Sequence, residues 1–460
     1  MLELNVPSPG KVLLPLALTQ FIASFAGSNM NVAINSIAED LGTTVQGIQV
    51  AITLFLLTMA ALMIPGSKLT DIWGRKRCLT IGLVIYGLGT ILAALSPGLG
   101  LLIVGYSIFQ GVGSALMIPP VYIITTVFFT NLTARAKAFG TINGMAGVGA
   151  ATGPLIGGFI TTAISWRASF LLQTLVILVI IFFRSSIVDP GVQGTRPRFD
   201  LVGAILSALG MIFIVVGILQ AGNNTSLVVL FLSLGAASLL WFFLHIRSKE
   251  RKGQEPLLST AMFRNRASNL GMVTQNIQWM VLMGIAFVVS VFLQVVRGYT
   301  SIQTGLIFTA ATVGILLSSL LAGRLAKRFT QRALIQAGFV ISLVGIAVLL
   351  WLVSSNPVSF LPGLFLIGAG VGVMLTPSVN VVQSSFPESE QGEISGLSRG
   401  VSNLGSSLGT AIAGTVLVSG IATGDRAYGL ALVALGAMGL IGLGAALFLP
   451  KNPLQTAGSD

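Results

Sequence analysis

The chain reads SKLTDIWGRKR at residues 67–77, between two long apolar stretches, residues 45–65 and 79–96. A second segment, GRLAKRFTQR at residues 323–332, follows another apolar stretch. Aligned from their first residues, both segments have a small, a basic, a leucine, a small and a charged residue in that order, and an aromatic residue in seventh place. The similarity predicts two related halves, each with such a loop after its second apolar stretch.

The composition excludes a water-soluble protein. Of the 460 residues, 54% are hydrophobic and 8% are charged, and the mean hydropathy is +0.93. Soluble domains carry about 25% charged residues, so soluble enzymes, nucleic-acid binders and disordered chains are excluded despite the net charge of +12. A single cysteine, Cys78, and one histidine leave no basis for an intramolecular disulfide or a soft-metal site. We therefore expect no metal, no cofactor and no nucleic-acid partner.

Apolar stretches of membrane-spanning length recur along the whole chain. A bilayer core of about 30 Å needs about 20 apolar residues per helix, and these stretches are too long and continuous for barrel strands. The prediction is an all-α integral membrane protein with 14 transmembrane helices. They are expected near residues 12–36, 45–65, 79–96, 101–127, 136–162, 165–187, 200–221, 227–246, 268–293, 302–322, 333–354, 358–384, 393–418 and 427–449.

The basic residues predict the orientation. With the N-terminus in the cytoplasm, 21 of the 25 Lys and Arg fall in cytoplasmic segments. Arg167, Arg297 and Arg426 fall outside, and Arg399 lies within a span. Basic residues concentrate on the cytoplasmic side of membrane proteins. We therefore expect a multi-pass protein of the plasma or inner cell membrane, surrounded by the lipid bilayer, with both termini cytoplasmic.

Two polar runs, residues 187–200 and 247–266, bracket the stretches 200–221 and 227–246. The loop at 67–77 follows the second predicted helix, and the loop at 323–332 follows the tenth. The difference of eight helices equals a repeat of six helices plus the two helices between the polar runs. Parallel repeats of six helices are a transporter architecture, with the substrate site between the halves. The predicted organisation is a six-helix half at 1–189, a linker with two extra helices at 190–255 and a second half at 256–460.

The segment at 67–77 resembles the signature loop of the major facilitator superfamily, Gly-x-Leu-Ala-Asp-x-x-Gly-Arg-Lys. The fifth span resembles the antiporter motif of its drug-efflux members. Together with fourteen spans, these motifs place the chain nearest the drug:proton antiporter branch. The resemblance implies a secondary transporter, not an enzyme, that exports small amphipathic molecules by alternating access. The residues of the antiporter motif are Gly149, Gly153, Pro154, Gly157 and Gly158.

In the family, the signature loop latches the cytoplasmic ends of the halves, which assigns gating roles to Asp71, Gly74, Arg75 and Lys76. We expect Asp71 near the start of the third span, where the helix dipole favours a carboxylate. Ser67 departs from the motif, which has glycine there. An ordinary basic loop without a latching role is the alternative.

Gly149, Gly153 and Gly157 fall on one helical face, so a neighbouring backbone can approach closely. Pro154 removes a helical hydrogen bond and favours a bend. The family resemblance implies that this helix, with Gly158, is a pivot and a seal between the halves. Packing alone is the alternative.

Both charged residues that the branch uses for proton coupling are missing. The resemblance places an acid where Ala26 stands, before Asn31-Val32-Ala33, and an arginine where Ser107 stands, before Gln110-Gly111. Since ionisable groups within the membrane mark coupling-ion pathways, protons remain only a possible partner. Glu393 is the remaining proton-coupling candidate, and it could also pair with Arg399.

The cavity between the halves is expected to be polar but nearly uncharged. Each amide could instead form an interhelical hydrogen bond, and Arg399 could snorkel. A proton-independent facilitator or lipid-like exporter, and a non-transporting scaffold or receptor, are the alternative functions. The candidate substrate-binding residues are Asn29, Asn31, Gln110, Asn143, Gln275, Asn276, Gln278, Trp279, Arg399 and Asn403.

Overall fold

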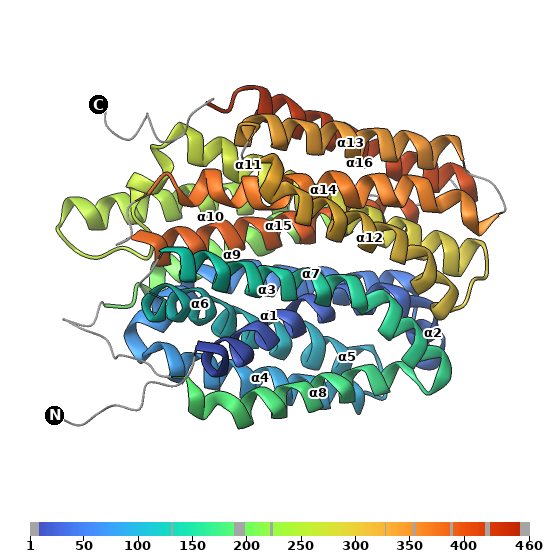
Figure 1. The fold of residues 1–460 in the computed structure, drawn as a ribbon, viewed down its shortest axis with the longest axis horizontal. Helices are drawn as coiled ribbons and strands as arrows, with labels where there is room; N and C mark the ends of the chain where they lie inside the picture. The colour runs from blue at the N-terminus through green and yellow to red at the C-terminus, as the bar shows by residue number, and fades with distance from the viewer. Residues whose placement is uncertain are drawn as a thin grey trace.

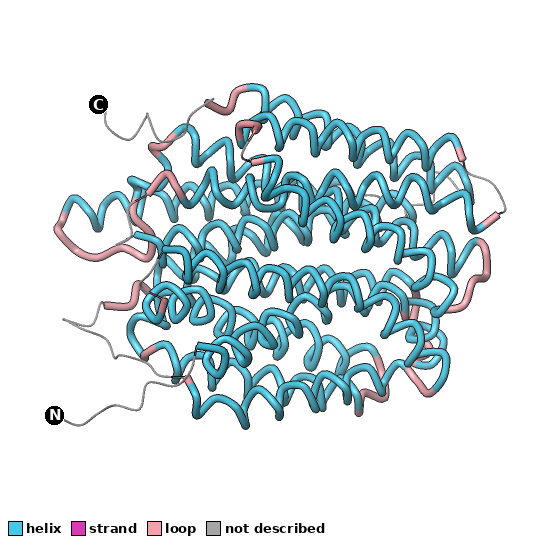
Figure 2. Tube along the Cα trace, viewed as in Figure 1, coloured by secondary structure: helices cyan, strands magenta, loops and turns pink. Residues whose placement is uncertain are grey.

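The computed structural model describes residues 9–129, 132–187, 198–220, 224–326, 328–352, 356–386, 390–418 and 424–450. These ranges are helical with short connections and contain no strand (Figure 2). Thirteen helices in the described ranges are long and apolar enough to cross a membrane. An all-α membrane fold satisfies every backbone group within its own helix, and this part of the prediction is confirmed.

The helices before the first polar run form one packed group. Within it, α1 packs on α7, α4 on α6 and α8, and α3 on α6. Its elements are α1 (Pro9–Val32), α2 (Ile34–Asp40), α3 (Val45–Trp73), α4 (Arg75–Ala94), α5 (Leu99–Leu102), the π-helical turn η1 (Ile103–Phe109), α6 (Gln110–Phe128), α7 (Leu132–Ala163), α8 (Trp166–Phe183) and the short turn η2 (Arg184–Ser186).

The helices after the second polar run form another packed group. There α11 packs on α14, α15 and α16, α12 on α14, and α13 on α14 and α16. Its elements are the turn η3 (Thr260–Phe263), α11 (Arg266–Val291), the π-helical turn η4 (Phe292–Val296), α12 (Ser301–Leu325), α13 (Gln331–Trp351), the turn η5 (Pro357–Phe360), α14 (Leu361–Gln383), α15 (Gln391–Val418) and α16 (Gly424–Leu447).

Helices α9 (Leu201–Leu219) and α10 (Thr225–Arg251) form a hairpin between the groups in sequence. Helix α9 packs on α10 and on both α3 and α15, the two helices that join the groups on this side. Leu57 of α3, Val215 of α9 and Ala411 of α15 share one buried cluster. The hairpin therefore covers the α3–α15 contact.

Helix α15 occupies the place of the thirteenth predicted span, residues 393–418. It has 28 residues, among them several serines and threonines, Asn403, Glu393 and Arg399, and it is not among the thirteen apolar helices. A buried helix with polar faces packs against other helices rather than lipid, and α15 contacts α3, α11, α16 and α9.

The bundle has two ends, which are the left and right sides of Figure 1. The left side, here called the terminal end, carries the start of α1, the α3–α4 junction and the end of α16. The right side, here called the opposite end, carries α2 and the α7–α8 junction. Contacts between the two helix groups occur at both ends.

Candidate functional site

The segment 67–77 forms the last turns of α3, a single-residue break at Gly74 and the start of α4. Gly74 has φ +90°, a conformation that side chains other than glycine rarely adopt. Asp71 lies in the last turn of α3 and α4 begins only at Arg75, so the prediction that Asp71 lies near the start of the third span is wrong. The backbone at this break adopts a positive φ, and Gly74 is the residue of the motif that has this conformation.

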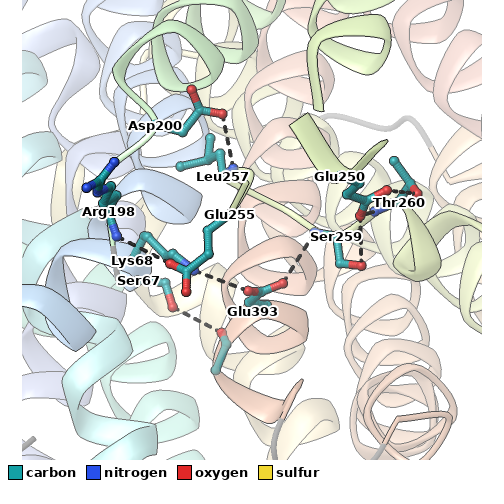
Figure 3. A network of polar contacts seen from close by, with 11 residues as sticks. Ser67, Lys68, Arg198, Asp200, Glu250, Glu255, Leu257, Ser259, Thr260 and Glu393 are labelled. Carbon is teal, nitrogen blue, oxygen red and sulfur yellow. Dashed lines mark hydrogen bonds and ion pairs between the residues drawn. The ribbon is translucent and has the colours of Figure 1, made fainter. Parts of the chain in front are cut away.

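Side chains of α3 contact the first turn of α15 at the terminal end (Figure 3). Ser67 Oγ donates to the Gly392 carbonyl at 3.0 Å, and Lys68 Nζ lies 3.4 Å from Glu393 Oε1. The side chains of Lys68 and Glu393 are 10% and 28% exposed. These four residues, here called the latch, join the two helix groups through polar contacts. Ser67, the departure from the family motif, therefore makes one of the inter-group hydrogen bonds.

The chain between α10 and α11 contacts the latch. The Ser259 amide donates to Glu393 Oε2 at 3.3 Å, so Glu393 is held from two sides (Figure 3). Glu250, at the end of α10, accepts from the Ser259 hydroxyl at 3.1 Å and from the Thr260 amide at 2.6 Å. The latch is thus connected to the hairpin as well as to α3.

Asp200 anchors the base of the hairpin. Its side chain is 1% exposed and lies 3.0 Å from His245 Nε2 and 3.1 Å from Lys249 Nζ. It also caps α9 by accepting from the Gly203 amide, and it accepts from the Leu257 amide at 3.2 Å. Burial opposes ionisation, but these donors outweigh it and lower the pKa of Asp200. The carboxylate therefore stays ionised and fixes the segment that follows α10.

The glycine face of α7 packs against α1 within the first helix group. Side chains added at Gly149 or Gly153 would collide with the backbone or side chains of α1, and one at Gly157 with the Asn29 side chain. On the adjacent face, a Cβ at Gly158 would collide with the Ser301 carbonyl of α12. These glycines allow the predicted close approach, and Pro154 lies in the same contact because its carbonyl abuts Gly305 of α12.

At the opposite end, further hydrogen bonds join the groups. The Asn31 carbonyl of α1 accepts from Ser290 and, at 3.0 Å, from Gln294, both on α11 and its π-helical turn. The Thr162 hydroxyl of α7 accepts from the Ile302 amide at 3.2 Å. These bonds and the Gly158–Ser301 and Gly305–Pro154 contacts are here called the seal. Nearby, a hydrogen bond from Arg167 is the main cause of a lowered pKa of Asp40.

The terminal-end half of α7 has a different environment. A Cβ added at Gly140, Gly144 or Gly147 would meet no atom within 4 Å. The same helix is therefore packed tightly between neighbours at the opposite end and borders open space toward the terminal end.

Two predicted binding residues on α11 are engaged in packing. Gln275 accepts from the Ser398 hydroxyl at 2.8 Å, and Asn276 donates to the Val401 carbonyl at 2.8 Å. Both partners lie on α15, so these amides fix α11 against α15. Gln278 is 1% exposed, and both of its amide atoms are without a partner among the described residues.

Buried side-chain oxygens or nitrogens without a described partner also occur in the first group. Gln110, directly after the π-helical turn η1, lacks partners for both amide atoms, and so do the side-chain oxygens of Asn29 and Asn31. Trp279 and Asn403 are half-buried. The Asn143 side chain lies outside the described residues.

Arg399 of α15 contacts the first group at Tyr122 of α6. Its guanidinium donates to the Tyr122 hydroxyl and lies 4.8 Å from the ring centroid. Tyr122 Oη also lies 3.5 Å from Gln20 Oε1 of α1. From the sequence, Glu393 was a candidate partner for Arg399, but in the structure Glu393 pairs with Lys68. Arg399 thus stacks on an aromatic ring between the groups.

The positions that lack the expected charges are packed. Ala26 is buried, and Ser107 is fully buried with its hydroxyl donating to the Ala51 carbonyl at 2.7 Å. Since Ala51 lies on α3, Ser107 helps to hold the π-helical turn against that helix. Ala26 and Ser107 therefore contribute to packing between helices.

Several residues of these contacts were not predicted from sequence. Lys68 looked like one of many basic loop residues, and Ser259 contributes a backbone amide that no side-chain pattern reveals. Asp200 gave a signal, an acid directly before an apolar stretch, which is typical of a helix N-cap. Tyr122 gave none.

An all-helical membrane bundle of two helix groups, joined by contacts at both ends, is typical of a membrane transporter. The Major Facilitator Superfamily model matches residues 16–410 and, a second time, residues 270–459. The chain belongs to this superfamily. It is a secondary transporter and not an enzyme, as the sequence predicted.

The relatives include drug-resistance and efflux proteins. The chain is 29% identical to puromycin resistance protein pur8 of Streptomyces alboniger, over 88% of this chain and 81% of that protein. It is 27% identical to multidrug efflux pump LfrA of Mycolicibacterium smegmatis, over 88% of this chain and 80% of that protein. The predicted resemblance to the multidrug-efflux branch is confirmed. A structure of peptide transporter POT in complex with sulfate matches with a TM-score of 0.67, 17% identity and 96% coverage of each chain, which shows the fold alone.

Proposed function

We propose that this transporter exports amphipathic or lipophilic small molecules across the plasma membrane by alternating access. The observation that carries the proposal is the difference between the ends of α7, which is sealed against α1 and α12 at the opposite end and borders open space at the terminal end. The names of the relatives, which include a puromycin resistance protein and a multidrug efflux pump, support drug-like cargo.

The terminal end faces the cytoplasm in this proposal, because most Lys and Arg lie there. The structure then has its far side closed by the seal, while its cytoplasmic side has open space beside α7 and the latch formed between α3 and α15. Helix α15 crosses the membrane as a fourteenth span. Residues 1–189 and 256–460 are the two moving halves, and residues 190–255 contribute the hairpin.

Substrate would bind between the halves, against the polar groups that packing leaves without partners. Gln110, Gln278 and Asn29 are buried and have such atoms. A few amides in an apolar cavity bind weakly polar molecules without demanding one shape. Gln275 and Asn276 act mainly as interhelical contacts in this proposal, so their substitution would affect packing before affinity.

The latch and the seal are both formed in this structure, and gating would proceed by breaking one of them while the other holds. Breaking the seal opens the far side while Lys68 and Glu393 hold the terminal end together. Asp71, Gly74, Arg75 and Lys76 shape the α3–α4 turn that presents this latch. Gly158 and Pro154 form the contact with α12 that must slide or tilt, while Gly149, Gly153 and Gly157 hold α7 against α1 in the same half.

A proton-independent facilitator or lipid-like exporter is favoured by a specific observation. Ala26 and Ser107 are packed where the antiporter branch carries charges. Glu393 remains the candidate for coupling, since a proton on its carboxylate would remove the ion pair with Lys68. The alternative of a non-transporting scaffold predicts no flux at all.

Flux in proteoliposomes, with and without an imposed pH gradient, tests the proposal. Gradient-driven export of fluorescent lipophilic dyes that Glu393→Gln abolishes supports proton coupling at Glu393. Flux that is the same with and without the pH gradient supports the proton-independent facilitator. Lack of flux for every dye, with folded protein, contradicts the proposed function.

A further inference from the structure

Arg399 is the charged residue placed deepest in a described helix. It is the ninth residue of α15, so it lies about 12 Å along the helix axis from Gln391, at a rise of about 1.5 Å per residue. Charged residues of the other described helices lie close to a helix end. Its side chain is half-buried and reaches from the second group to Tyr122 of the first.

The charge of Arg399 has no carboxylate partner among the described residues. The carboxylates that form ion pairs there belong to Glu393, Asp40, Asp200 and Asp425, and each pairs with another basic residue. Arg399 has only the hydroxyl and ring face of Tyr122. Contact of a cation with an aromatic face is favourable by about 1–2 kcal/mol of free energy, whereas removing a charge from water costs several kcal/mol. The positive charge is therefore incompletely compensated.

An uncompensated positive charge between the halves selects cargo by its sign. We infer that Arg399 is the specificity-determining residue of the substrate site and that the preferred cargo is an amphipathic anion, with a carboxylate, sulfonate or phosphate group. This inference rests on the proposed export function. An anionic head group would supply the missing counter-charge and accept the bidentate hydrogen bonds of a guanidinium. A lipophilic cation would be repelled, since Arg399 forms no ion pair with a carboxylate among the described residues.

Tyr122 acts here as a positioning residue. Its ring holds the guanidinium plane from one side, and its hydroxyl also lies near Gln20 of α1. The remaining guanidinium donors are left for ligand. Because Arg399 and Tyr122 belong to different helix groups, an anion bound to Arg399 would change the contact between the groups.

Two dyes on one ring system test the inference. Fluorescein is an anion and tetramethylrhodamine methyl ester is a cation, and both contain the same xanthene core. Binding of each dye to the detergent-solubilised full-length protein is measured by fluorescence anisotropy, with protein-free micelles subtracted. The variants are Arg399→Gln, Arg399→Lys, which retains the charge, and Tyr122→Phe, which retains the ring.

We expect tighter binding of fluorescein than of the rhodamine ester. Arg399→Gln should weaken fluorescein binding about tenfold or more, which equals about 1.4 kcal/mol, without weakening the cation. Arg399→Lys and Tyr122→Phe should keep the preference for the anion. Equal or weaker binding of fluorescein by the native protein, or equal losses for both dyes in Arg399→Gln, overturns the inference.

Transport of the same dyes in proteoliposomes separates this inference from the proposed function. An anion preference in binding without flux of either dye contradicts export but upholds the charge selectivity of the site. Flux of the cation in preference to the anion upholds export and overturns the inference.

Discussion

At the opposite end the two helix groups meet through close backbone packing, with Gly158 against Ser301 and Gly305 against Pro154, and through uncharged hydrogen bonds such as that from Gln294 to the Asn31 carbonyl. At the terminal end they meet through side chains, with Lys68 against Glu393 and Ser67 against Gly392. Backbone contact through glycine depends on shape and responds little to pH or salt. An ion pair that is partly exposed depends on charge and is screened. The seal thus combines glycine packing with uncharged hydrogen bonds, whereas the latch contains an ion pair.

The terminal end has an additional support that the opposite end lacks in the described residues. The hairpin base, through Asp200 and Glu250, holds the segment whose Ser259 amide contacts Glu393. The base of the inserted hairpin therefore supports the terminal end, while α9 also packs along α3 and α15.

The largest effect is expected from Asp200→Ala. The substitution removes the α9 N-cap and leaves Lys249 and the Leu257 amide without their acceptor, which should cost about 3 kcal/mol of unfolding free energy. Thermal unfolding in detergent measures the loss, and hydrogen exchange locates it at residues 252–265. Glu255→Ala, which removes an exposed acceptor of the Arg198 amide, should change stability by less than about 0.5 kcal/mol. Equal losses in both variants would contradict an anchoring role.

A smaller but more specific effect is expected from Gly158→Val. The new side chain collides with the Ser301 backbone, and overpacking of this kind costs about 2 kcal/mol. The seal should open, and a cysteine introduced at Ser36 should become more reactive toward an impermeant maleimide in a Cys78→Ser background. Gly144→Val has no atom within 4 Å of its Cβ and should leave labelling unchanged. Unchanged labelling in Gly158→Val would show that this contact does not close the opposite end.

Weakening the latch should have a moderate effect. Glu393→Gln removes the ion pair with Lys68, worth about 1 kcal/mol at this exposure, and should shift the equilibrium about fivefold toward separated terminal ends. Distances between labels on α3 and α15 report this shift, and high salt should mimic it in the native protein. Asp425→Asn breaks an exposed pair with Arg297 inside the second group and should leave the distances alone. A matching shift in that control would rule out a specific latch.

The opposite end should be insensitive to pH near neutrality. Because Arg167 lowers the pKa of Asp40 below 3.8, its stabilising bond is fully present above that value and is lost only as pH falls through the lowered pKa. The difference in melting temperature between the native protein and Asp40→Asn should stay constant from about pH 5 to about pH 8. A difference that declines between pH 7 and pH 5 would indicate a raised pKa.

Much of the fold could be predicted because membrane helices are specified locally. Runs of about 20 apolar residues must become helices in a bilayer, and each predicted span coincides with a helix of the structure. The site was predicted less well. Gln275 and Asn276 looked like cavity residues, but they bond across to α15, and no one-dimensional pattern distinguishes an amide that faces a neighbour from one that faces a cavity.

The class of protein, the helices, and the glycine and loop motifs that mark the family follow from local sequence, because hydropathy, helical periodicity and glycine spacing act over neighbouring residues. The partners of the charged side chains follow from the packing of distant helices. Glu393 pairs with Lys68, 325 residues away, rather than with Arg399 on its own helix, and Arg399 stacks on Tyr122, 277 residues away. Contacts at such separation depend on how helices rotate and cross, which the packing of the whole bundle sets.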